Sequence, residues 1–480
     1  MALMQLPVEL LEQVISHTLP EGFESLALTC KYLYTLCIPF LEHHNNLRWH
    51  FRDFRYFKTN KPFRYNYGLF RFPDTATSAF DLISRIAIET NVGHYILKAD
   101  FTGDSRLCSK TGREYTTYGD RHDAVRQLLA DSAYLREAGL NWEEYYNDMM
   151  EDVNSYCYSQ HAAAFVLTLL PNLHRFRPSE LWNPTPATEK LIAAIIHTAR
   201  RTDRNEASFA QVTAFEGTGG KYGSSWATSI IALPRIRSFE GSGWIGEPYR
   251  NRYLCPDFNS QVEEVWFLDT SIDTVAIMNF LRHTPYLKSL TYWHSTKDSM
   301  GHQDWDLCGF IAAVQCETGS HLENLSAITT ELSCSISPGK LYLRGFQRLQ
   351  SLELPLEIVI CGLKATELEG HGSLDPKFLL GDLVPPSVAR LSLFSPGKIP
   401  HEKALSLLFH DFATQKQVQM LSVKEISLTC PSDADDLYKA QCMSLTAETE
   451  KVGVVLVLTE YPAPISTVGI DDDEYCLEYE

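Results

Sequence analysis

The sequence predicts an α/β protein with a small all-helical N-terminal module and a long array of strand–helix repeats. Three observations support this prediction. The first fifty residues carry two short segments whose apolar residues recur with the period of amphipathic helices. Short strand-like segments then recur along the rest of the chain, and helix-like segments precede several of them. Hydrophobic residues make up 44% of the 480, which is enough for a large core or several small ones.

The first helix is expected to begin at Pro7, since proline fits the first helical turn, where its missing N–H would have no partner. The apolar residues that follow at helical spacing are Val8, Leu10, Leu11, Val14, Ile15 and Leu19, and Pro20 ends the segment. A second helix is expected over Glu24–Leu36, with Pro39 closing it. Two such helices cannot bury their apolar faces alone, so they need the rest of the chain or another protein.

The wording of this segment resembles the fungal form of the F-box. It reads Leu-Pro-x-Glu-Leu-Leu-x-x-Val-Ile from Leu6 and Leu-x-Leu-Thr-Cys-Lys-x-Leu-Tyr from Leu26, although the loop between the helices departs from the family pattern. In that family three short helices pack on the adaptor Skp1, which bridges to a cullin. The resemblance implies that residues 1–42 form an F-box, and an ordinary helical hairpin packed on its own domain is the alternative. The Skp1-binding residues that it implies, some of which must instead form the module's own core, are Leu6, Pro7, Leu10, Leu11, Val14, Ile15, Leu26, Leu28, Cys30 and Leu33.

Residues 43–79 are expected to be a linker that packs its aromatic side chains against the neighbouring domain. Aromatic and basic residues alternate there, as they also do in proteins that bind single-stranded nucleic acid. The formal net charge of −18 favours the packing interpretation, because phosphate contacts need clustered Lys and Arg. We therefore expect no nucleic-acid partner.

Residues 80–460 are expected to form a degenerate leucine-rich-repeat-like α/β solenoid, a horseshoe. From Phe176 onward, the second apolar residue of each strand-like segment lies 24 to 39 residues after its predecessor. One strand and one helix per unit at this period is typical of such solenoids, and an unrelated α/β domain with parallel strands is the alternative. The expected strands are Tyr95–Phe101, Leu173–Phe176, Val212–Phe215, Ile236–Phe239, Val262–Val265, Leu287–Leu290, Leu322–Leu325, Leu349–Leu352, Val388–Leu391, Val423–Ile426 and Val452–Val455.

Parallel strands stacked in a solenoid line a concave face that suits a protein partner. Aromatic residues after the strands are candidate contacts, because exposed Trp is enriched at binding hot spots, although packing in a core is its more common use. The candidate substrate-binding residues are Trp244, Trp266, Trp293, His294 and Trp305.

Two acidic segments complete the chain. A helical acidic insertion is expected near 120–160, within an early repeat. Residues 461–480 are expected to be a solvated acidic tail, with a binding role as the less common alternative.

Motifs for chemistry are missing from the sequence. It has no C-x-x-C, G-x-S-x-G or H-E-x-x-H, so we expect no catalytic residue, no metal and no cofactor. Twelve scattered cysteines are typical of a reducing compartment, and the N-terminus lacks the features of a signal peptide. The longest apolar run, Ala162–Leu170, is far shorter than the roughly 20 residues of a membrane span. We expect no membrane partner and a cytoplasmic or nuclear protein, or one found in both compartments.

The function expected from these features is that of a non-catalytic substrate-recognition adaptor of an SCF-type E3 ubiquitin ligase. Its F-box would bind a Skp1-type adaptor and through it a cullin, and its repeats would bind an unknown protein substrate. A cullin-independent F-box/Skp1 scaffold and a general protein–protein interaction repeat protein are the alternatives. An enzyme whose site is dispersed over loops is a further one, for which the sequence offers no positive feature.

Overall fold

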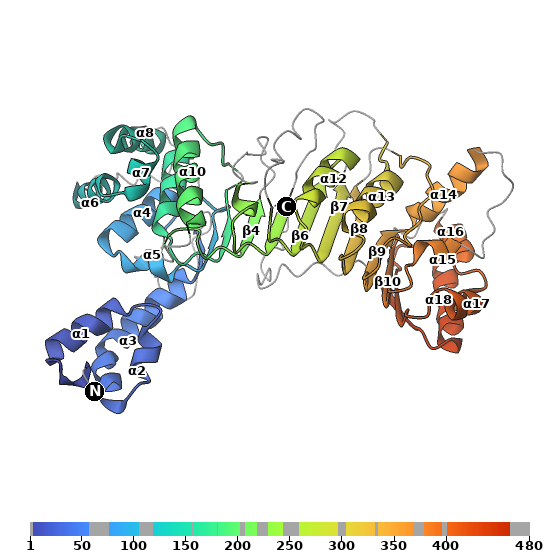
Figure 1. The fold of residues 1–480 in the computed structure, drawn as a ribbon, viewed down its shortest axis with the longest axis horizontal. Helices are drawn as coiled ribbons and strands as arrows, with labels where there is room; N and C mark the ends of the chain where they lie inside the picture. Colours follow the sequence, from blue (N-terminus) through green and yellow to red (C-terminus); the bar gives the residue numbers. More distant parts are fainter. Residues whose placement is uncertain are drawn as a thin grey trace. The chain divides into compact units, whose positions relative to one another are not determined.

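Short parallel strands alternate with helices along the chain, as the computed structural model shows (Figure 1). The strands are ordered β1 to β12 as they occur in the sequence, and the predicted α/β class is confirmed. Two compact units divide the chain: the first holds the elements from α1 to β5, and the second holds those from β6 to β12. The residues that the structure describes are 3–56, 76–104, 119–154, 158–179, 181–201, 207–217, 229–242, 259–295, 304–331, 335–368, 379–395 and 401–460.

The first unit opens with a short 3-10 helix (η1, Leu3–Gln5) and three α-helices, where the sequence predicted two helices. α1 (Val8–His17) begins one residue later than expected, with Pro7 at its N-cap. The predicted second helix is broken into α2 (Phe23–Ala27) and α3 (Lys31–Phe51). The break falls at Cys30, whose extended backbone (φ −160°, ψ 162°) cannot continue α2 and instead starts α3.

The prediction that Pro39 ends the second helix is wrong, because α3 runs through Pro39 to Phe51. A proline inside a helix removes one backbone hydrogen bond and typically costs about 3 kcal/mol. Beyond it α3 buries His44, Leu47 and Phe51, and this packing outweighs the local penalty. The expected boundary after residue 42 therefore falls inside a continuous helix.

The rest of the first unit supplies five strands and the helices between them. The segment expected as a linker contributes β1, which pairs in parallel with β2, while residues 57–75 of that segment lie outside the described residues. The expected helical insertion contains α6 to α8. The elements are β1 (Asp53–Arg55), α4 (Ala79–Ile88), α5 (Asn91–Tyr95), β2 (Lys98–Asp100), α6 (Gly119–Ala130), α7 (Ala133–Glu137), α8 (Trp142–Asn154), α9 (Gln160–Val166), β3 (Arg175–Arg177), α10 (Pro186–Arg200), β4 (Ala214–Gly217) and β5 (Ser238–Ser242).

A row of phenylalanines in ring-to-ring contact, edge-on in two pairs and stacked in the other two, crosses the core of the first unit. The ring centroids of Phe54 and Phe101 are 6.1 Å apart, and those of Phe101 and Phe176 are 5.7 Å apart. Phe215 continues the row 5.8 Å from Phe176, and Phe239 follows 5.9 Å beyond Phe215. Each such pair contributes about 0.5–1.5 kcal/mol beyond its burial, so the row stabilises the stacking of consecutive strands.

Seven strands lie in the described part of the second unit, and at least one helix follows each of five of them. Figure 1 shows α12 and α13 along one side of β6 to β9. The aromatic contacts agree, since Phe267 meets Phe280 of α12 and Tyr292 meets Phe310 of α13. The elements are β6 (Glu264–Thr270), α12 (Thr274–Arg282), β7 (Ser289–Ser295), α13 (Leu307–Thr318), β8 (Asn324–Glu331), β9 (Ser351–Pro355), α14 (Glu357–Leu368), α15 (Leu379–Leu383), β10 (Arg390–Phe394), α16 (His401–Leu408), α17 (Phe412–Val418), β11 (Glu425–Thr429), α18 (Asp436–Lys451) and β12 (Val455–Thr459).

One hydrogen-bond pattern recurs where the strands begin. Two successive backbone N–H groups donate to a single carbonyl oxygen at the start of the preceding strand. In the second unit the N–H groups of Lys288 and Ser289 donate to the carbonyl of Glu263 at 2.7 and 3.0 Å. The same pair of bonds recurs at β2, β3, β4, β5, β8, β9, β10 and β11. The units therefore share a local geometry as well as a sequence spacing.

All eleven predicted strands overlap observed ones, but each observed strand begins two or three residues later than expected. The predicted segments opened on an apolar residue such as Leu287 or Val388. These residues are buried, yet they lie in the turn before the strand. The N–H of Leu287 donates to Thr284 O at 3.1 Å, and that of Val388 donates to Pro385 O at 3.1 Å. Burial alone therefore did not mark the strand boundary.

Candidate protein-binding surfaces

The helices α1 to α3 pack around a small core of their own. Its buried members are Ile15, Phe23, Ala27 and Cys37, with partly buried leucines around them. Of the ten residues that the F-box resemblance implies, Leu11, Ile15 and Leu33 are buried, and Leu11 is only 1% exposed. These three side chains support the module and do not reach its surface.

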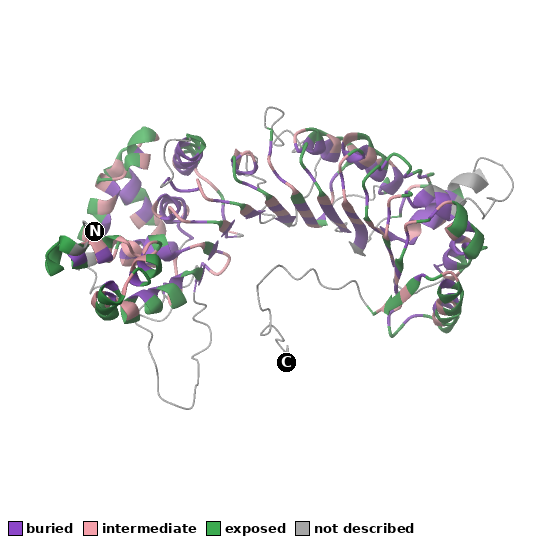
Figure 2. Ribbon diagram, turned by 60° about the horizontal axis from the view of Figure 1, so that its bottom comes forward, coloured by how far each residue is buried: buried purple, intermediate pink, exposed green. Residues whose placement is uncertain are grey.

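Other members of the predicted set are at the surface. Leu6, Pro7, Leu10 and Leu28 are exposed, with Leu10 at 44% and Leu28 at 82%, whereas the remaining three residues are half-buried. Figure 2 shows exposed and buried stretches side by side along these helices. We call the exposed apolar residues of this module the N-terminal apolar surface: Leu6, Pro7, Val8, Leu10, Leu28, Tyr32, Tyr34 and Ile38.

Four members of this surface were not predicted, namely Val8, Tyr32, Tyr34 and Ile38. Sequence periodicity assigned Val8 to the apolar stripe of the first helix, but the F-box motif allows any residue at this position. The sequence predicted one continuous second helix, and this prediction could not show which residues of α3 face the core and which face solvent. The break at Cys30 sets the phase of α3, which turns Leu33 inward and leaves Tyr32 and Tyr34 outward.

The second half of α3 joins the module to the rest of the first unit. His44 Nδ1 lies 2.8 Å from the hydroxyl of Tyr95, and its ring packs on Phe23 with centroids 4.7 Å apart. His43 meets Glu89 at 2.5 Å. Burial lowers the pKa of His44, so this residue is neutral at the centre of the junction near pH 7.

The second unit has a sheet face on the side opposite its helices. Successive strand residues point to opposite faces, so Trp266 and Trp293 point away from Phe267 and Tyr292, which contact the helices. Both tryptophans are half-buried. We call this side, as formed by strands β6 to β12, the open face. Trp244, the first of the predicted substrate contacts, lies outside the described residues.

His294 and Trp305 lie in the core, not on the open face. His294 is 2% exposed and stacks on Trp305 with ring centroids 3.9 Å apart. Its Nδ1 lies 2.8 Å from the hydroxyl of Tyr292, and burial lowers its pKa to about 3. This pair therefore packs the space beneath α13 and is not accessible to a partner.

A carboxylate that the sequence analysis did not single out lies on the open face. Glu353 of β9 accepts hydrogen bonds from Ser326 Oγ at 2.5 Å and from Ser392 Oγ at 3.1 Å. The register pairs Ser326 with Glu353 and Glu353 with Ser392, so the three residues form one row across neighbouring strands. The alternation Leu-Glu-Leu in β9 is the signal that could have found Glu353, because a residue between two core leucines points to the other face.

The corresponding face of the first unit carries charges of both signs that pair with one another. Lys98 meets Asp53 at 3.3 Å, and Glu216 forms ion pairs with Arg175 and Arg177. Burial and the adjacent Glu216 raise the pKa of Glu240, against the opposing effect of the two arginines. This compensation between neighbours is typical of a structural ladder of ion pairs.

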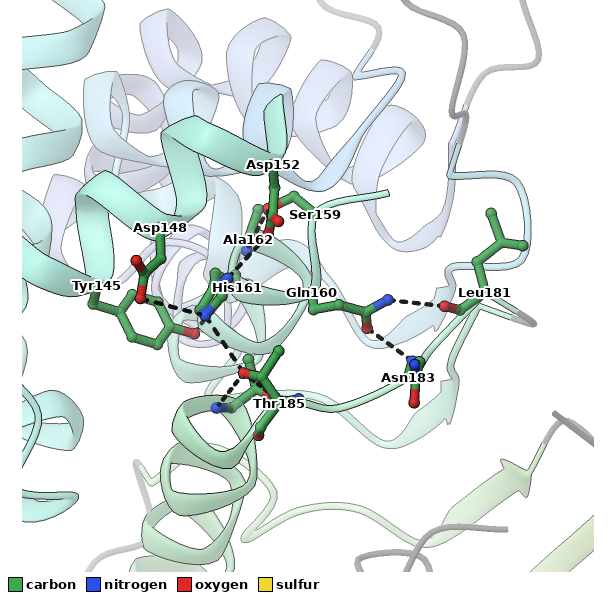
Figure 3. A network of polar contacts seen from close by, with 11 residues as sticks. Tyr145, Asp148, Asp152, Ser159, Gln160, His161, Ala162, Leu181, Asn183 and Thr185 are labelled. Atoms are coloured by element: carbon green, nitrogen blue, oxygen red, sulfur yellow. Dashed lines mark hydrogen bonds and ion pairs between the residues drawn. The ribbon is translucent and has the colours of Figure 1, made fainter. Parts of the chain in front are cut away.

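A polar network around His161 joins three helices of the first unit (Figure 3). His161 Nδ1 donates to Asp152 at 2.9 Å, and its Nε2 lies 3.4 Å from Thr185 Oγ1. This order of carboxylate, imidazole and hydroxyl is that of a nucleophilic triad. Thr185, however, caps α10 by accepting from the N–H of Thr188 at 3.3 Å. Ser159 caps α9 in the same way and also donates to Asp152.

The network around His161 thus fits a structural role in joining α8, α9 and α10. The ring of Tyr145 packs edge-on against His161, and its hydroxyl donates to the backbone carbonyl of that residue at 2.8 Å. His161 is itself buried, so the imidazole is enclosed by the helices that it connects.

Within the described ranges, no group of three His, Cys, Asp or Glu residues is placed to hold a metal ion. No helix among these residues is both long and apolar enough to span a membrane. No known family model matches the chain, and no curated protein matches it.

Proposed function

We propose that this chain is a non-catalytic substrate-recognition adaptor of an SCF-type ubiquitin ligase. Its N-terminal module would bind a Skp1-type adaptor, and through it a cullin, while its open face would bind a protein substrate. One observation is the main support for the proposal: some residues of the F-box-like motif are also exposed apolar residues on the surface of the module. Leu6, Pro7, Leu10 and Leu28 belong to both.

The N-terminal apolar surface supports the adaptor half of the proposal on physical grounds. Large exposed apolar side chains gathered on one small module mark interaction sites in soluble proteins. Burying a leucine side chain in an interface contributes about 1.5–3 kcal/mol, so a few such residues suffice for a specific contact. The α3 junction at His44 would hold this surface at a fixed place on the first unit.

We infer for the repeats a leucine-rich-repeat-like solenoid. Parallel strands in chain order, one shared hydrogen-bond pattern at their starts and helices on one side support this inference. The opposite side then offers a long protein-binding face. Simultaneous binding of adaptor and substrate would act by raising the local concentration of the substrate near the ubiquitin carrier.

Co-purification of the full chain with Skp1 and a cullin tests the proposal. Leu10→Asp should abolish Skp1 capture, because a charge would replace an exposed apolar contact without entering the module's core. Leu437→Asp is a matched control, since Leu437 of α18 is an exposed leucine (61%) far along the sequence from the module. Leu11→Asp is unsuitable as a test, because a charge at this buried position would unfold the module.

Three results are informative. Skp1 and cullin recovered with the wild type and the Leu437→Asp variant, but not with Leu10→Asp, would support the proposal. Recovery of Skp1 without cullin would favour a cullin-independent scaffold. A folded wild type that captures no Skp1 would refute the proposal.

A further inference from the structure

Glu353 is a charged group on the open face with no opposite charge attached to it. Among the described residues it forms no ion pair, and the neutral hydroxyls of Ser326 and Ser392 donate hydrogen bonds to it. A carboxylate has about four acceptor positions, and these two bonds use two of them. The serines hold the carboxylate in one orientation and leave acceptor capacity for a further donor.

The charged residues at the strand positions of the open face are mostly acidic, and the one nearest to Glu353 in the sheet is Arg390 on the adjacent strand β10. At regular strand positions of the open face, Glu264 and Glu425 are exposed acids and Arg390 is the basic residue. The register places Arg390 beside Glu425 and Ser351, two residues along the strand from the row that contains Glu353. Among the residues that the structure describes there, three carboxylates against one guanidinium give this face an acidic balance, in keeping with the net charge of −18 for the chain.

Half-buried aromatic side chains lie on either side of Glu353. Trp266 belongs to the same row, three strands away, which corresponds to about 14 Å at the usual strand spacing of about 4.8 Å. Trp293 lies on β7, two residues beyond the row of Glu353, and Phe394 of β10 lies two residues beyond Ser392. A carboxylate between partly exposed aromatic rings can receive a cationic group and the apolar stem that carries it.

We propose that the open face binds an extended basic segment of a protein, with a Lys or Arg side chain placed on Glu353. At about 3.3 Å per residue, four to five residues of extended chain cover the distance from Glu353 to Trp266. The bound segment therefore carries an apolar or aromatic residue four or five positions from its basic one. An Arg or Lys donor to this carboxylate makes a charge-assisted hydrogen bond and brings a positive charge, which the neutral serines cannot supply.

The statement that the bound segment belongs to a ubiquitin-ligase substrate rests on the proposed function. As a statement about binding, it depends only on the open face. A test that uses peptides in place of Skp1 therefore separates the two.

The probe is a phage-displayed library of random 12-residue peptides, selected on the immobilised full-length protein. Enriched peptides are synthesised with a fluorescent label, and their Kd values are measured by anisotropy against the wild type, Glu353→Gln and Glu448→Gln. Glu448 is an exposed glutamate of α18 and serves as the matched control. Glutamine at 353 keeps an oxygen that can accept from both serines while it removes the charge.

The expected result is enrichment of peptides with a Lys or Arg four or five positions from an apolar residue. Their Kd should rise at least tenfold with Glu353→Gln and stay within twofold with Glu448→Gln. The double variant Ser326→Ala with Ser392→Ala keeps the charge but frees its orientation, so we expect a smaller rise of about threefold to fivefold.

Three outcomes would overturn the inference: peptides without a basic residue, peptides that bind Glu353→Gln as tightly as the wild type, or no enrichment at all. An unchanged thermal unfolding curve of the Glu353→Gln protein, compared with the wild type, shows that the variant is folded. If the wild type binds basic peptides but not Skp1, the proposed function fails and the inference about the open face stands.

Discussion

At the scale of single residues, burial divides the N-terminal apolar positions into two kinds. Leu10 and Leu11 are neighbours in the sequence and both fit the F-box wording, yet Leu10 is exposed and Leu11 is buried. Consecutive helical residues point about 100° apart, so a wide apolar stripe includes positions at its edge that miss the core. Six of the ten predicted residues lie in α1 to α3, whereas Leu6 and Pro7 precede α1, and Leu28 and Cys30 lie between α2 and α3. The orientation of each residue depends on how the three helices pack.

Ile15→Ala should destabilise the N-terminal module by about 2–4 kcal/mol, because it leaves a cavity beside Phe23 and Cys37 in the small core. Leu28→Ala is the matched control, since its exposed side chain should change stability by no more than about 0.5 kcal/mol. Hydrogen exchange of the amides of α1 measures both effects. Equal losses of protection in the two variants would contradict the assignment of core and surface.

His294 should make stability depend on pH. Its folded pKa of about 3 lies below the value of about 6.5 expected when the chain is unfolded, so the folded state favours the neutral ring. This contribution is fully present above pH 6.5 and is lost as the pH falls from 6.5 towards 3. Between pH 7 and pH 4.5 the loss should be about 2–3 kcal/mol.

The His294→Gln variant isolates this effect, because glutamine does not titrate. Chemical denaturation at several pH values gives the free energy of unfolding of wild type and variant. The wild type should lose more stability on acidification, whatever fixed cost the substitution adds. Parallel pH profiles for the two proteins would contradict a buried neutral His294.

At the scale of elements, α3 shows where local signals lose to packing. The extended backbone at Cys30 splits a helix that apolar periodicity treats as continuous, since periodicity carries no information on backbone angles. Pro39 is a strong local signal for a helix end, but burial of Leu47 and Phe51 further along carries the helix through it. Local sequence rules therefore could not predict where α3 begins and ends.

Pro39→Ala should stabilise the protein by about 1–3 kcal/mol. Alanine restores the N–H that can donate to the helical carbonyl four residues earlier, and it removes the clash of the proline ring. The side chain at this position is exposed, so no packing is lost. The change in the unfolding midpoint on chemical denaturation measures the effect. A lower stability of the variant would mean that α3 depends on the geometry that Pro39 imposes.

The sequence predicted every strand except β1, and in the correct order. The predicted strands begin two or three residues too early. β1 was missed because Phe54 is its one buried strand residue, and it lies in a segment rich in other aromatics. The alternation of apolar and polar residues within each strand could have predicted open-face residues such as Glu353. The candidate list emphasised tryptophans instead, and it included His294 and Trp305, which the fold buries.

At the scale of the whole molecule, the chain consists of two compact units, each with its own core. Unfolding should therefore show two calorimetric transitions, because units with separate cores need not unfold together. Phe176→Ala removes a ring from the phenylalanine row of the first unit, and Leu352→Ala removes a buried leucine of the second. Each substitution should lower one transition by several degrees and leave the other within about 1 °C.

A single transition that shifts equally in both variants would contradict this description of the molecule. It would mean that the two cores melt as one cooperative body. Val418→Ala, at an exposed position of α17, is the control that should move neither transition.

The central claim is that the N-terminal module binds Skp1 through its exposed apolar residues. Titration calorimetry of purified Skp1 into the full chain tests it most directly, with wild type, Leu10→Asp and Leu437→Asp compared in one buffer. We predict saturable binding for the wild type and Leu437→Asp, and at least a hundredfold weaker binding for Leu10→Asp, about 2.7 kcal/mol. No binding by a folded wild type, or equal binding by all three proteins, would contradict the claim.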